Sequence, residues 1–263
     1  MPFDAIKTTP VANAGYPQGM SRLEYASGAD GEWDDALIKP SNDDRWIVCI
    51  HGFGGKSTQL FMRTDIKRAW LPCYLKRGLG IIAPTLRGNS WMRPESVADM
   101  DDMLDYLRED FGARRFYFCS GSLGATCNLI YAGMRPENVS GVIAHAPACE
   151  LGDYYAFCVA NAHLQPMLFD VAASIRDAMG GTPDQQPEMY RSRSSIYMAE
   201  RLTMPIAVLH GTQDELIPVE HSRRLANSLS WNPSFSYAEY PELDHNGAIG
   251  LSEEGILDKI LGI

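Results

Sequence analysis

Short apolar runs alternate with longer amphipathic stretches from about residue 45 onward, and this alternation constrains the fold more than any other feature. Several of the short runs are continuously apolar, as strands covered on both faces must be. They are 46–51 (WIVCIH), 80–84 (GIIAP), 115–120 (RFYFCS), 141–146 (GVIAHA), 205–210 (PIAVLH) and 235–240 (FSYAEY).

The stretches between these runs have helical periodicity. It is clearest in 94–111, where apolar residues at three- and four-residue spacing fall on one face. The other predicted helices are 57–77, 122–134, 219–229 and 252–261. Strands that alternate with helices predict right-handed crossovers, and hence an α/β fold with a mostly parallel sheet covered by helices on both faces.

Two regions depart from this rhythm. The first 45 residues predict one or two less regular strands, 22–26 and 36–39, at an antiparallel edge of the sheet. Residues 147–187 form a long connection rich in aromatic residues, Met, Gly and Pro, and a connection of that length in a compact domain is usually functional. We therefore expect a single domain over residues 1–263 with a cap-like insertion at about 147–187.

The charge and the cysteines bear on partners and location. A formal net charge of −10 argues against nucleic acid or an anionic membrane as a partner, because both require a basic surface.

The N-terminal MPFDAIKTTP does not read as a secretory signal, and the sequence has no apolar run long enough for a transmembrane helix. Six scattered cysteines lack metal-ligand spacing, so we expect a cytoplasmic protein without a metal; a Cys149–Cys158 disulfide is the alternative for an exported chain.

The strongest chemical signal is the pentapeptide SGSLG at 120–124, which follows one apolar run directly and opens a helical stretch. A serine hydroxyl is a weak nucleophile that must be exposed beside a base, and a sharp strand-to-helix turn exposes Ser122 at the N-terminus of a helix. Position 120 is Ser where the G-x-S-x-G pattern has Gly. A simple Gly/Ser turn that opens an ordinary helix is the alternative interpretation.

A second glycine-rich segment, HGFGG at 51–55, ends the first of the apolar runs. Glycines there allow the backbone to fold back beside the serine, so the backbone N–H groups of Phe53 and Leu123 are the candidate oxyanion-hole donors. A plain strand-to-helix turn and a phosphate loop are the alternatives, but neither nucleotide-binding glycine spacing is met.

An acid and a base follow later in the chain. Asp214 comes directly after the run at 205–210 and can orient an imidazole, with Glu215 as the rival acid. Among six histidines, His245 alone lies on a predicted loop after the final strand, where a base can reach the serine. The order Ser, Asp, His, each beyond the carboxyl end of a strand, predicts a catalytic triad at one edge of the sheet.

The other histidines are expected to be structural or carry no motif. His51 and His210 lie at strand ends beside glycine and are expected to pack, and His145 is expected in the core. His163 and His221 have no motif around them.

The chain resembles the α/β-hydrolase superfamily, and within it the single-domain relatives of the prolyl oligopeptidase catalytic domain and related esterases. The segments that carry the resemblance are HGFGG at 51–55, LRGNS at 86–90, SGSLG at 120–124, GTPDQQPEMYRSRSS at 181–195 and PIAVLHGTQDELIPVEHS at 205–222. The resemblance implies that Ser122, Asp214 and His245 form the triad, that Phe53 and Leu123 provide the oxyanion hole, and that no cofactor is needed.

Departures from the peptidase pattern favour esters over peptides. The sequence has neither a preceding β-propeller nor an obvious acidic pair for a peptide amino terminus. Position 53 is Phe, where peptidase members have a Tyr whose hydroxyl donates to the oxyanion.

The sequence thus predicts a serine esterase that acts on a small-molecule carboxylic ester, with Trp91, Tyr154 and Phe157 lining the substrate pocket. A small peptidase or amide hydrolase, a thioesterase or carbon–carbon hydrolase, and a non-catalytic ligand-binding protein are the alternatives. The sequence does not specify the acyl group, the alcohol or the oligomeric state.

Overall fold

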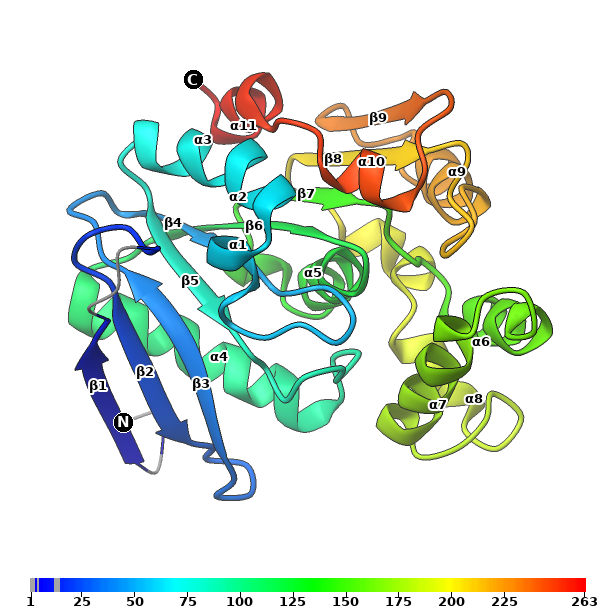
Figure 1. Ribbon diagram of the computed structural model, residues 1–263, viewed down its shortest axis with the longest axis horizontal. Coiled ribbons are helices and arrows are strands. Elements are labelled where there is room, and N and C mark those ends of the chain that lie inside the picture. Colours follow the sequence, from blue (N-terminus) through cyan, green and yellow to red (C-terminus); the bar gives the residue numbers. More distant parts are fainter. Residues whose placement is uncertain (1–2, 4, 12–14) are drawn as a thin grey trace.

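The computed structural model describes residues 3, 5–11 and 15–263. These residues build one nine-stranded sheet with the order β1-β2-β3-β5-β4-β6-β7-β8-β9 (Figure 1). Strands β1 to β3 and the β3–β5 pair are antiparallel, and all neighbours from β5 to β9 are parallel. The strands are β1 (Ala5–Pro10), β2 (Ser21–Ala26), β3 (Trp33–Lys39), β4 (Arg45–Val48), β5 (Gly80–Pro84), β6 (Arg115–Gly121), β7 (Gly141–His145), β8 (Ile206–Gly211) and β9 (Phe235–Tyr240).

Helices cover both faces of the sheet, as the alternating pattern predicts. On one face, α4 (Pro94–Phe111), α5 (Leu123–Met134) and α9 (Glu220–Ser228) pack on a core that contains Trp46, Phe116 and Phe118. On the other face, α1 (Gln59–Met62), α2 (Thr64–Ala69), α3 (Leu71–Lys76) and α11 (Glu254–Leu261) enclose Ile47, Ile81 and Ile143. Each residue of β5, β7 and β8 is buried, which explains why these strands are apolar without alternation.

Three elements differ from the sequence prediction. Strand β1 is not predicted because it is a polar edge strand with no buried residue. The helix predicted at 57–77 is three short helices: Arg63 has an extended conformation between α1 and α2, and Pro72 lies at the start of α3. His245 begins a short helix, α10 (His245–Ile249), and does not lie on a loop.

The insertion between β7 and β8 is helical and extends beyond the predicted boundary of 187. It contains α6 (Leu151–Asn161), α7 (Met167–Met179), α8 (Pro187–Ser192) and a 3₁₀ segment, η2 (Ser195–Arg201). The Glu150 side chain caps α6 by accepting hydrogen bonds from the backbone N–H groups of Gly152 and Asp153. We call α6 to α8 the cap helices, and Figure 1 shows them grouped beside the sheet.

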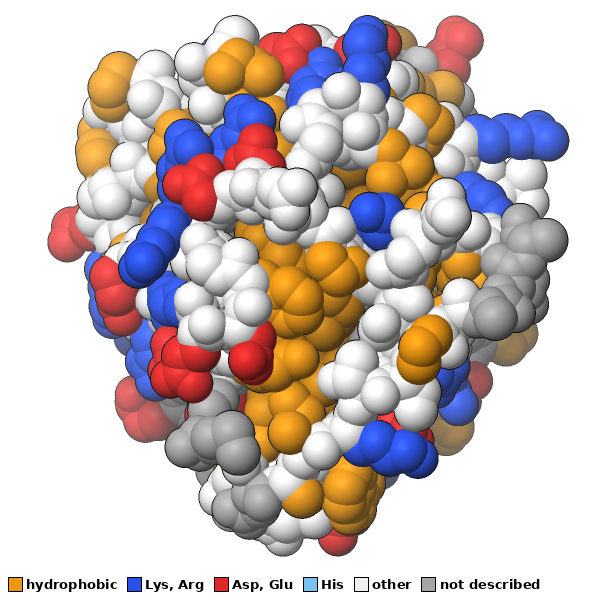
Figure 2. All heavy atoms as spheres, turned by 90° about the vertical axis from the view of Figure 1, so that its left-hand side faces the viewer, with side chains coloured by type: hydrophobic (Ala, Val, Ile, Leu, Met, Phe, Trp, Pro, Cys, Tyr) orange, Lys and Arg blue, Asp and Glu red, His pale blue; other side chains and the backbone are white. Residues whose placement is uncertain are grey.

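The surface at the β1 side mixes charges of both signs. Figure 2 shows a band of hydrophobic side chains in a hollow on this face, with acidic and basic side chains interspersed around it. In the described part of the chain, no helix is both long and apolar enough to cross a bilayer. All six cysteines are buried and unpaired, so the alternative Cys149–Cys158 disulfide is absent.

One glycine allows α5 to approach the backbone of the segment that follows β4. A Cβ atom at Gly124 would lie 2.2 Å from the carbonyl oxygen of Ile50 and 2.9 Å from that of His51. Backbone atoms cannot move aside as a flexible side chain would, so we expect Gly124→Ala to lower the free energy of unfolding by about 3 kcal/mol or more. Chemical denaturation measures the difference.

Gly255 provides the matched control for this substitution. It lies in α11, where a Cβ atom would meet nothing within 4 Å. We expect Gly255→Ala to stabilise the protein by roughly 0.5–1 kcal/mol, because alanine loses less backbone freedom on folding into a helix. A Gly124→Ala protein as stable as Gly255→Ala would contradict the close approach of α5 to Ile50.

Candidate active site

Ser122 lies at a strained turn between β6 and α5. Its φ of 60° and ψ of −127° place it in a region that non-glycine residues avoid, at a cost of about 1–3 kcal/mol. The backbone N–H of Ser122 donates to the carbonyl oxygen of His145 at 2.8 Å and so holds the turn. The Ser120 hydroxyl accepts a hydrogen bond from the backbone N–H of Ile50 at 2.9 Å, which gives the serine at this position a structural use that glycine would lack.

Asp214 and His245, which the sequence places far from Ser122, lie next to it in the structure. His245 Nε2 is 2.9 Å from Ser122 Oγ, and His245 Nδ1 is 2.6 Å from Asp214 Oδ2. The Asp214 carboxylate has no exposed surface, and its Oδ1 accepts hydrogen bonds from the backbone N–H groups of Leu216 and Ile217 at 2.9 and 2.8 Å. Hydroxyl, imidazole and carboxylate therefore form one continuous hydrogen-bonded line.

His210 is a further contact of this acid that the sequence interpretation missed. Its Nε2 lies 3.1 Å from Asp214 Oδ2 and 2.9 Å from the carbonyl oxygen of Ile217, while its Nδ1 lies 2.7 Å from Ser222 Oγ. Both oxygens near Nε2 are acceptors, so this nitrogen must carry the proton. The expectation that His210 only packs is therefore incomplete, because its ring also donates to the carboxylate.

The protonation state of Asp214 follows from these contacts. Burial alone would raise the pKa of the carboxyl, but hydrogen bonds from His210 and His245 and the charge of His245 lower it. The net effect places the pKa well below its ordinary value. The carboxylate is therefore ionised at neutral pH and can stabilise a protonated imidazole beside it.

His145 connects the serine turn to the helix that carries His245. Its backbone oxygen accepts from Ser122, its Nδ1 lies 2.9 Å from the carbonyl oxygen of Ala248 in α10, and its Nε2 lies 3.0 Å from Glu253 Oε1. The Tyr74 hydroxyl donates to Glu253 Oε2 at 2.6 Å. His145, Tyr74 and Glu253 are fully buried, so the histidine expected in the core also ties two parts of the site together.

The two candidate oxyanion donors border the same cavity as Ser122. Among the described residues, neither the backbone N–H of Phe53 nor that of Leu123 has a hydrogen-bond acceptor. Both residues line the cavity together with Ser122. Each N–H is thus available to a ligand atom.

The cavity beside Ser122 has a volume of about 140 Å³, which is small against the roughly 300–1,000 Å³ of pockets that hold drug-sized ligands. Of the three residues predicted to line the substrate pocket, Trp91 and Tyr154 border this cavity, whereas Phe157 lines an adjacent groove over Pro218 and Val219. The indole N–H of Trp91 donates to Ser174 Oγ in α7 at 2.9 Å, so the cap helices hold this wall. Met167, Leu168 and Val171 of the insertion also line the cavity, and so do Gln59, Arg63, Leu216 and Asn246, which the sequence interpretation did not single out.

Comparison with known proteins agrees with this architecture. Residues 45–178, about half of the chain, match the family model of the alpha/beta hydrolase fold. The chain belongs to the α/β-hydrolase family. This confirms the resemblance on which the sequence interpretation relies.

One curated relative of this α/β hydrolase is the "Uncharacterized peptidase YtmA" of Bacillus subtilis (strain 168). It is 24% identical over 163 residues, which cover 59% of this chain and 60% of that protein. The match therefore spans less than two thirds of the relative.

Solved structures with the same fold include esterases and a peptidase. Est1E from Butyrivibrio proteoclasticus has a TM-score of 0.66 at 15% identity, over 91% of this chain and 99% of its own. The Pyrococcus furiosus esterase Pf2001 has a TM-score of 0.69 at 13% identity, over 92% of each chain. A puromycin-hydrolyzing peptidase of Mycobacterium tuberculosis has a TM-score of 0.69 at 17% identity, over 95% of this chain but 39% of its own. At such identities the likeness extends to the fold alone.

Proposed function

We propose that this α/β hydrolase is a serine esterase that cleaves small carboxylic esters through an acyl-enzyme intermediate. The observation that carries the proposal is the line from Ser122 Oγ through His245 to Asp214, with separations of 2.9 and 2.6 Å. A serine needs this arrangement to become a nucleophile at neutral pH.

The proposed mechanism assigns one task to each group. His245 Nε2 removes the Ser122 proton as Oγ attacks the ester carbonyl, and the buried Asp214 stabilises the imidazolium that forms. The negative charge on the tetrahedral intermediate rests on the N–H groups of Phe53 and Leu123. His245 then gives its proton to the leaving alcohol. In the second half, His245 takes a proton from a water molecule that attacks the acyl carbonyl, and returns it to Ser122 Oγ as the bond to the acyl group breaks and the acid leaves.

The cavity supports short esters over peptides. Of the described residues that line it, none is acidic, so it offers no carboxylate to bind the amino terminus of a peptide. Most of the wall formed by Trp91, Tyr154 and the cap helices is apolar, and the volume of about 140 Å³ suits a short acyl chain. We therefore propose short-chain carboxylic esters as substrates.

A small peptidase or amide hydrolase is the second candidate. It is favoured by the name of the Bacillus relative and by the puromycin-hydrolyzing peptidase among the solved structures. The same triad can cleave esters, amides and thioesters. A thioesterase would differ from an esterase in its cavity, and a silent ligand-binding protein would differ in the reactivity of Ser122.

The test combines active-site labelling with a matched substrate panel. A fluorophosphonate probe should label Ser122, as located by peptide mass spectrometry, and p-nitrophenyl acetate and butyrate should be hydrolysed with a higher kcat/KM than the octanoate. Dipeptidyl and aminoacyl p-nitroanilides are expected to react at least about 100-fold more slowly. Faster turnover of the anilides would assign the peptidase, and folded protein without a labelled serine would assign the silent binding protein.

We also propose a cytoplasmic location for this reaction. All six cysteines are buried and unpaired, which is typical of proteins from a reducing compartment. Detection of the native protein in a soluble cytosolic fraction, rather than in an exported one, tests this assignment.

A further inference from the structure

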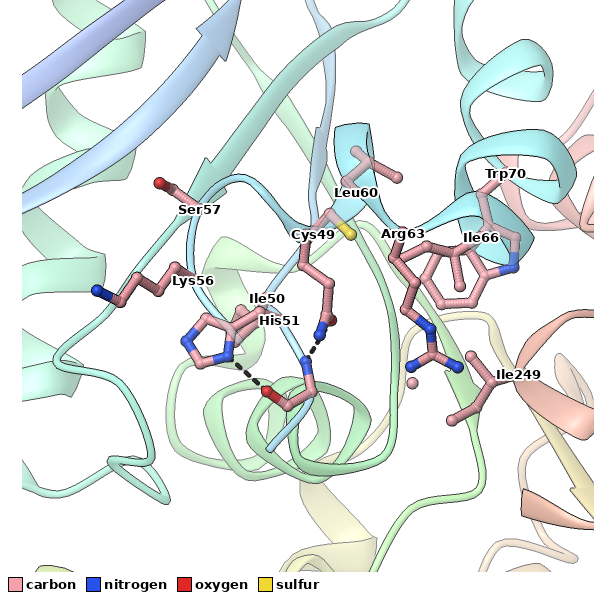
Figure 3. A pocket seen from close by; sticks show the side chains of 13 residues that line it. Cys49, Ile50, His51, Lys56, Ser57, Leu60, Arg63, Ile66, Trp70 and Ile249 are labelled. Atoms are coloured by element: carbon pink, nitrogen blue, oxygen red, sulfur yellow. Dashed lines mark hydrogen bonds between the residues drawn. The ribbon is translucent and has the colours of Figure 1, made fainter. Parts of the chain in front are cut away.

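The backbone N–H groups on either side of Phe53 are held by two side chains from different parts of the chain. Gly52 donates to Gln59 Oε1 at 2.7 Å, an interaction marked in Figure 3, and Gly54 donates to Asn89 Oδ1 at 2.8 Å. Gly55 donates to the carbonyl oxygen of Gly52 at 2.9 Å. In the described structure, Phe53 is thus the one residue from 52 to 55 whose N–H lacks an acceptor.

Gln59, the first residue of α1, contacts this loop closely and also borders the cavity. A Cβ atom at Gly52 would lie 3.5 Å from Gln59 Oε1 and 3.9 Å from Ser122 Cβ, so Gln59 holds the loop where it passes the serine. A Cβ atom at Gly55 would lie 2.6 Å from Gln59 Nε2, so a second glycine makes room for the amide. Because the Gly52 N–H can only donate, the amide oxygen of Gln59 must face it.

Asn89 belongs to a different part of the chain, the segment that follows β5. The same segment anchors His51, because His51 Nε2 lies 2.8 Å from the carbonyl oxygen of Thr85. The loop is therefore attached to two separate elements, α1 through Gln59 and residues 85–89 through Thr85 and Asn89. Two attachments that flank one free donor fix the direction of that donor, which a single attachment would leave free to turn.

We propose that Gln59 and Asn89 are positioning residues that fix the Phe53 N–H as an oxyanion donor. This inference rests on the proposed function, because it requires an oxyanion to form at Ser122. Donors that are already oriented toward the developing charge need no reorganisation during the reaction, which is the main source of oxyanion stabilisation. Both amides hold the loop by its backbone N–H groups, so their loss should affect the transition state more than the bound ester.

The experiment compares variants that lose the accepting oxygen with one that keeps it. Gln59→Met and Asn89→Ala remove the acceptor, whereas Asn89→Asp retains an oxygen at the same place. Each variant is assayed for kcat and KM on p-nitrophenyl acetate and for inhibition by phenylboronic acid, whose tetrahedral adduct resembles the intermediate. Thermal unfolding and fluorophosphonate labelling report whether each variant is folded with an intact serine.

We expect Gln59→Met and Asn89→Ala each to lower kcat by about 10-fold or more with KM changed less than twofold, and to weaken phenylboronic acid by a similar factor. The double variant should approach the loss of about 10²–10³ that follows removal of one oxyanion donor. Asn89→Asp should stay within about threefold of the wild type, which a role limited to filling space would not predict.

Two results would contradict the positioning role of Gln59 and Asn89. Wild-type kcat and inhibitor affinity in Gln59→Met, with only the unfolding temperature lowered, would overturn the inference by showing a purely structural contact. A raised KM with unchanged kcat would overturn it in favour of ground-state binding. If the wild-type protein hydrolyses no ester, the proposed function is wrong. If the wild type is active and the variants keep its kcat and inhibitor affinity, the inference alone is wrong.

Discussion

Replacing Ser122 by alanine is expected to lower kcat for p-nitrophenyl acetate by about 10⁵–10⁶, the loss that follows removal of a nucleophile from a triad. The reason is chemical, since Ser122 Oγ is the oxygen that would form the acyl bond and it lies 2.9 Å from His245 Nε2. Fluorophosphonate labelling should disappear at the same time, while the far-ultraviolet circular dichroism spectrum stays that of the wild type.

Ser120→Ala is the matched control, because it removes a hydroxyl from the same turn. The Ser120 hydroxyl binds the backbone of Ile50 and not His245. Its loss should cost roughly 1 kcal/mol of stability and should reduce kcat far less than the loss of Ser122. If Ser122→Ala kept wild-type activity in folded protein, the assignment of the nucleophile would be wrong.

The second large effect is expected for Asp214→Asn, which should lower kcat by about 10⁴. An amide has one oxygen where the carboxylate has two, and Asp214 accepts from two backbone N–H groups as well as from two imidazoles. If the oxygen takes the backbone donors of Leu216 and Ile217, the NH₂ group faces His245 Nδ1. His245 then holds its proton on Nε2 and cannot accept one from Ser122.

The neighbouring acid supplies the control for this prediction. Glu215 is the rival that sequence alone leaves open, and Glu215→Gln should change kcat less than threefold, because the acid bonded to His245 is Asp214. Steady-state kinetics on the same ester compares the two variants. A larger loss in Glu215→Gln than in Asp214→Asn would transfer the role to Glu215.

Much of this fold can be predicted from sequence because its central strands are buried on both faces. Burial makes β5, β7 and β8 apolar throughout, and α4 carries a clear helical stripe, so their limits agree closely with the sequence pattern. Strand β1 has no such signal, since it pairs only with β2 at the edge and its side chains are exposed or half-buried. The breaks at Arg63 and Pro72 follow from local backbone geometry that a run of helix-forming residues hides.

The candidate site likewise contains residues that the sequence identifies and residues that it does not. Ser122, Asp214 and His245 could be chosen from sequence because each follows a strand and motif order is preserved within the family. Gln59, Asn89 and His210 could not be chosen in this way. Their roles depend on which backbone or carboxylate group each side chain contacts after folding. In the sequence alone, an isolated Gln or Asn, or a His at the end of an apolar run, cannot be distinguished from a residue that only packs.

The position of the cap helices has a consequence for how such an enzyme can change its preferences. The whole excursion from residue 146 to 205 leaves the sheet at β7 and returns at β8, which are adjacent strands paired in register from Val142 and Ile206 onward. Because these strands are parallel, the excursion starts at the carboxyl end of β7 and finishes at the amino end of β8, on the opposite edge of the sheet. The cap helices contribute no strand to the sheet, so they can be lengthened, shortened or exchanged for those of another enzyme without moving the strands that precede Ser122 and Asp214. One wall of the cavity is thus formed by a stretch of chain separate from the turns that hold Ser122 and Asp214.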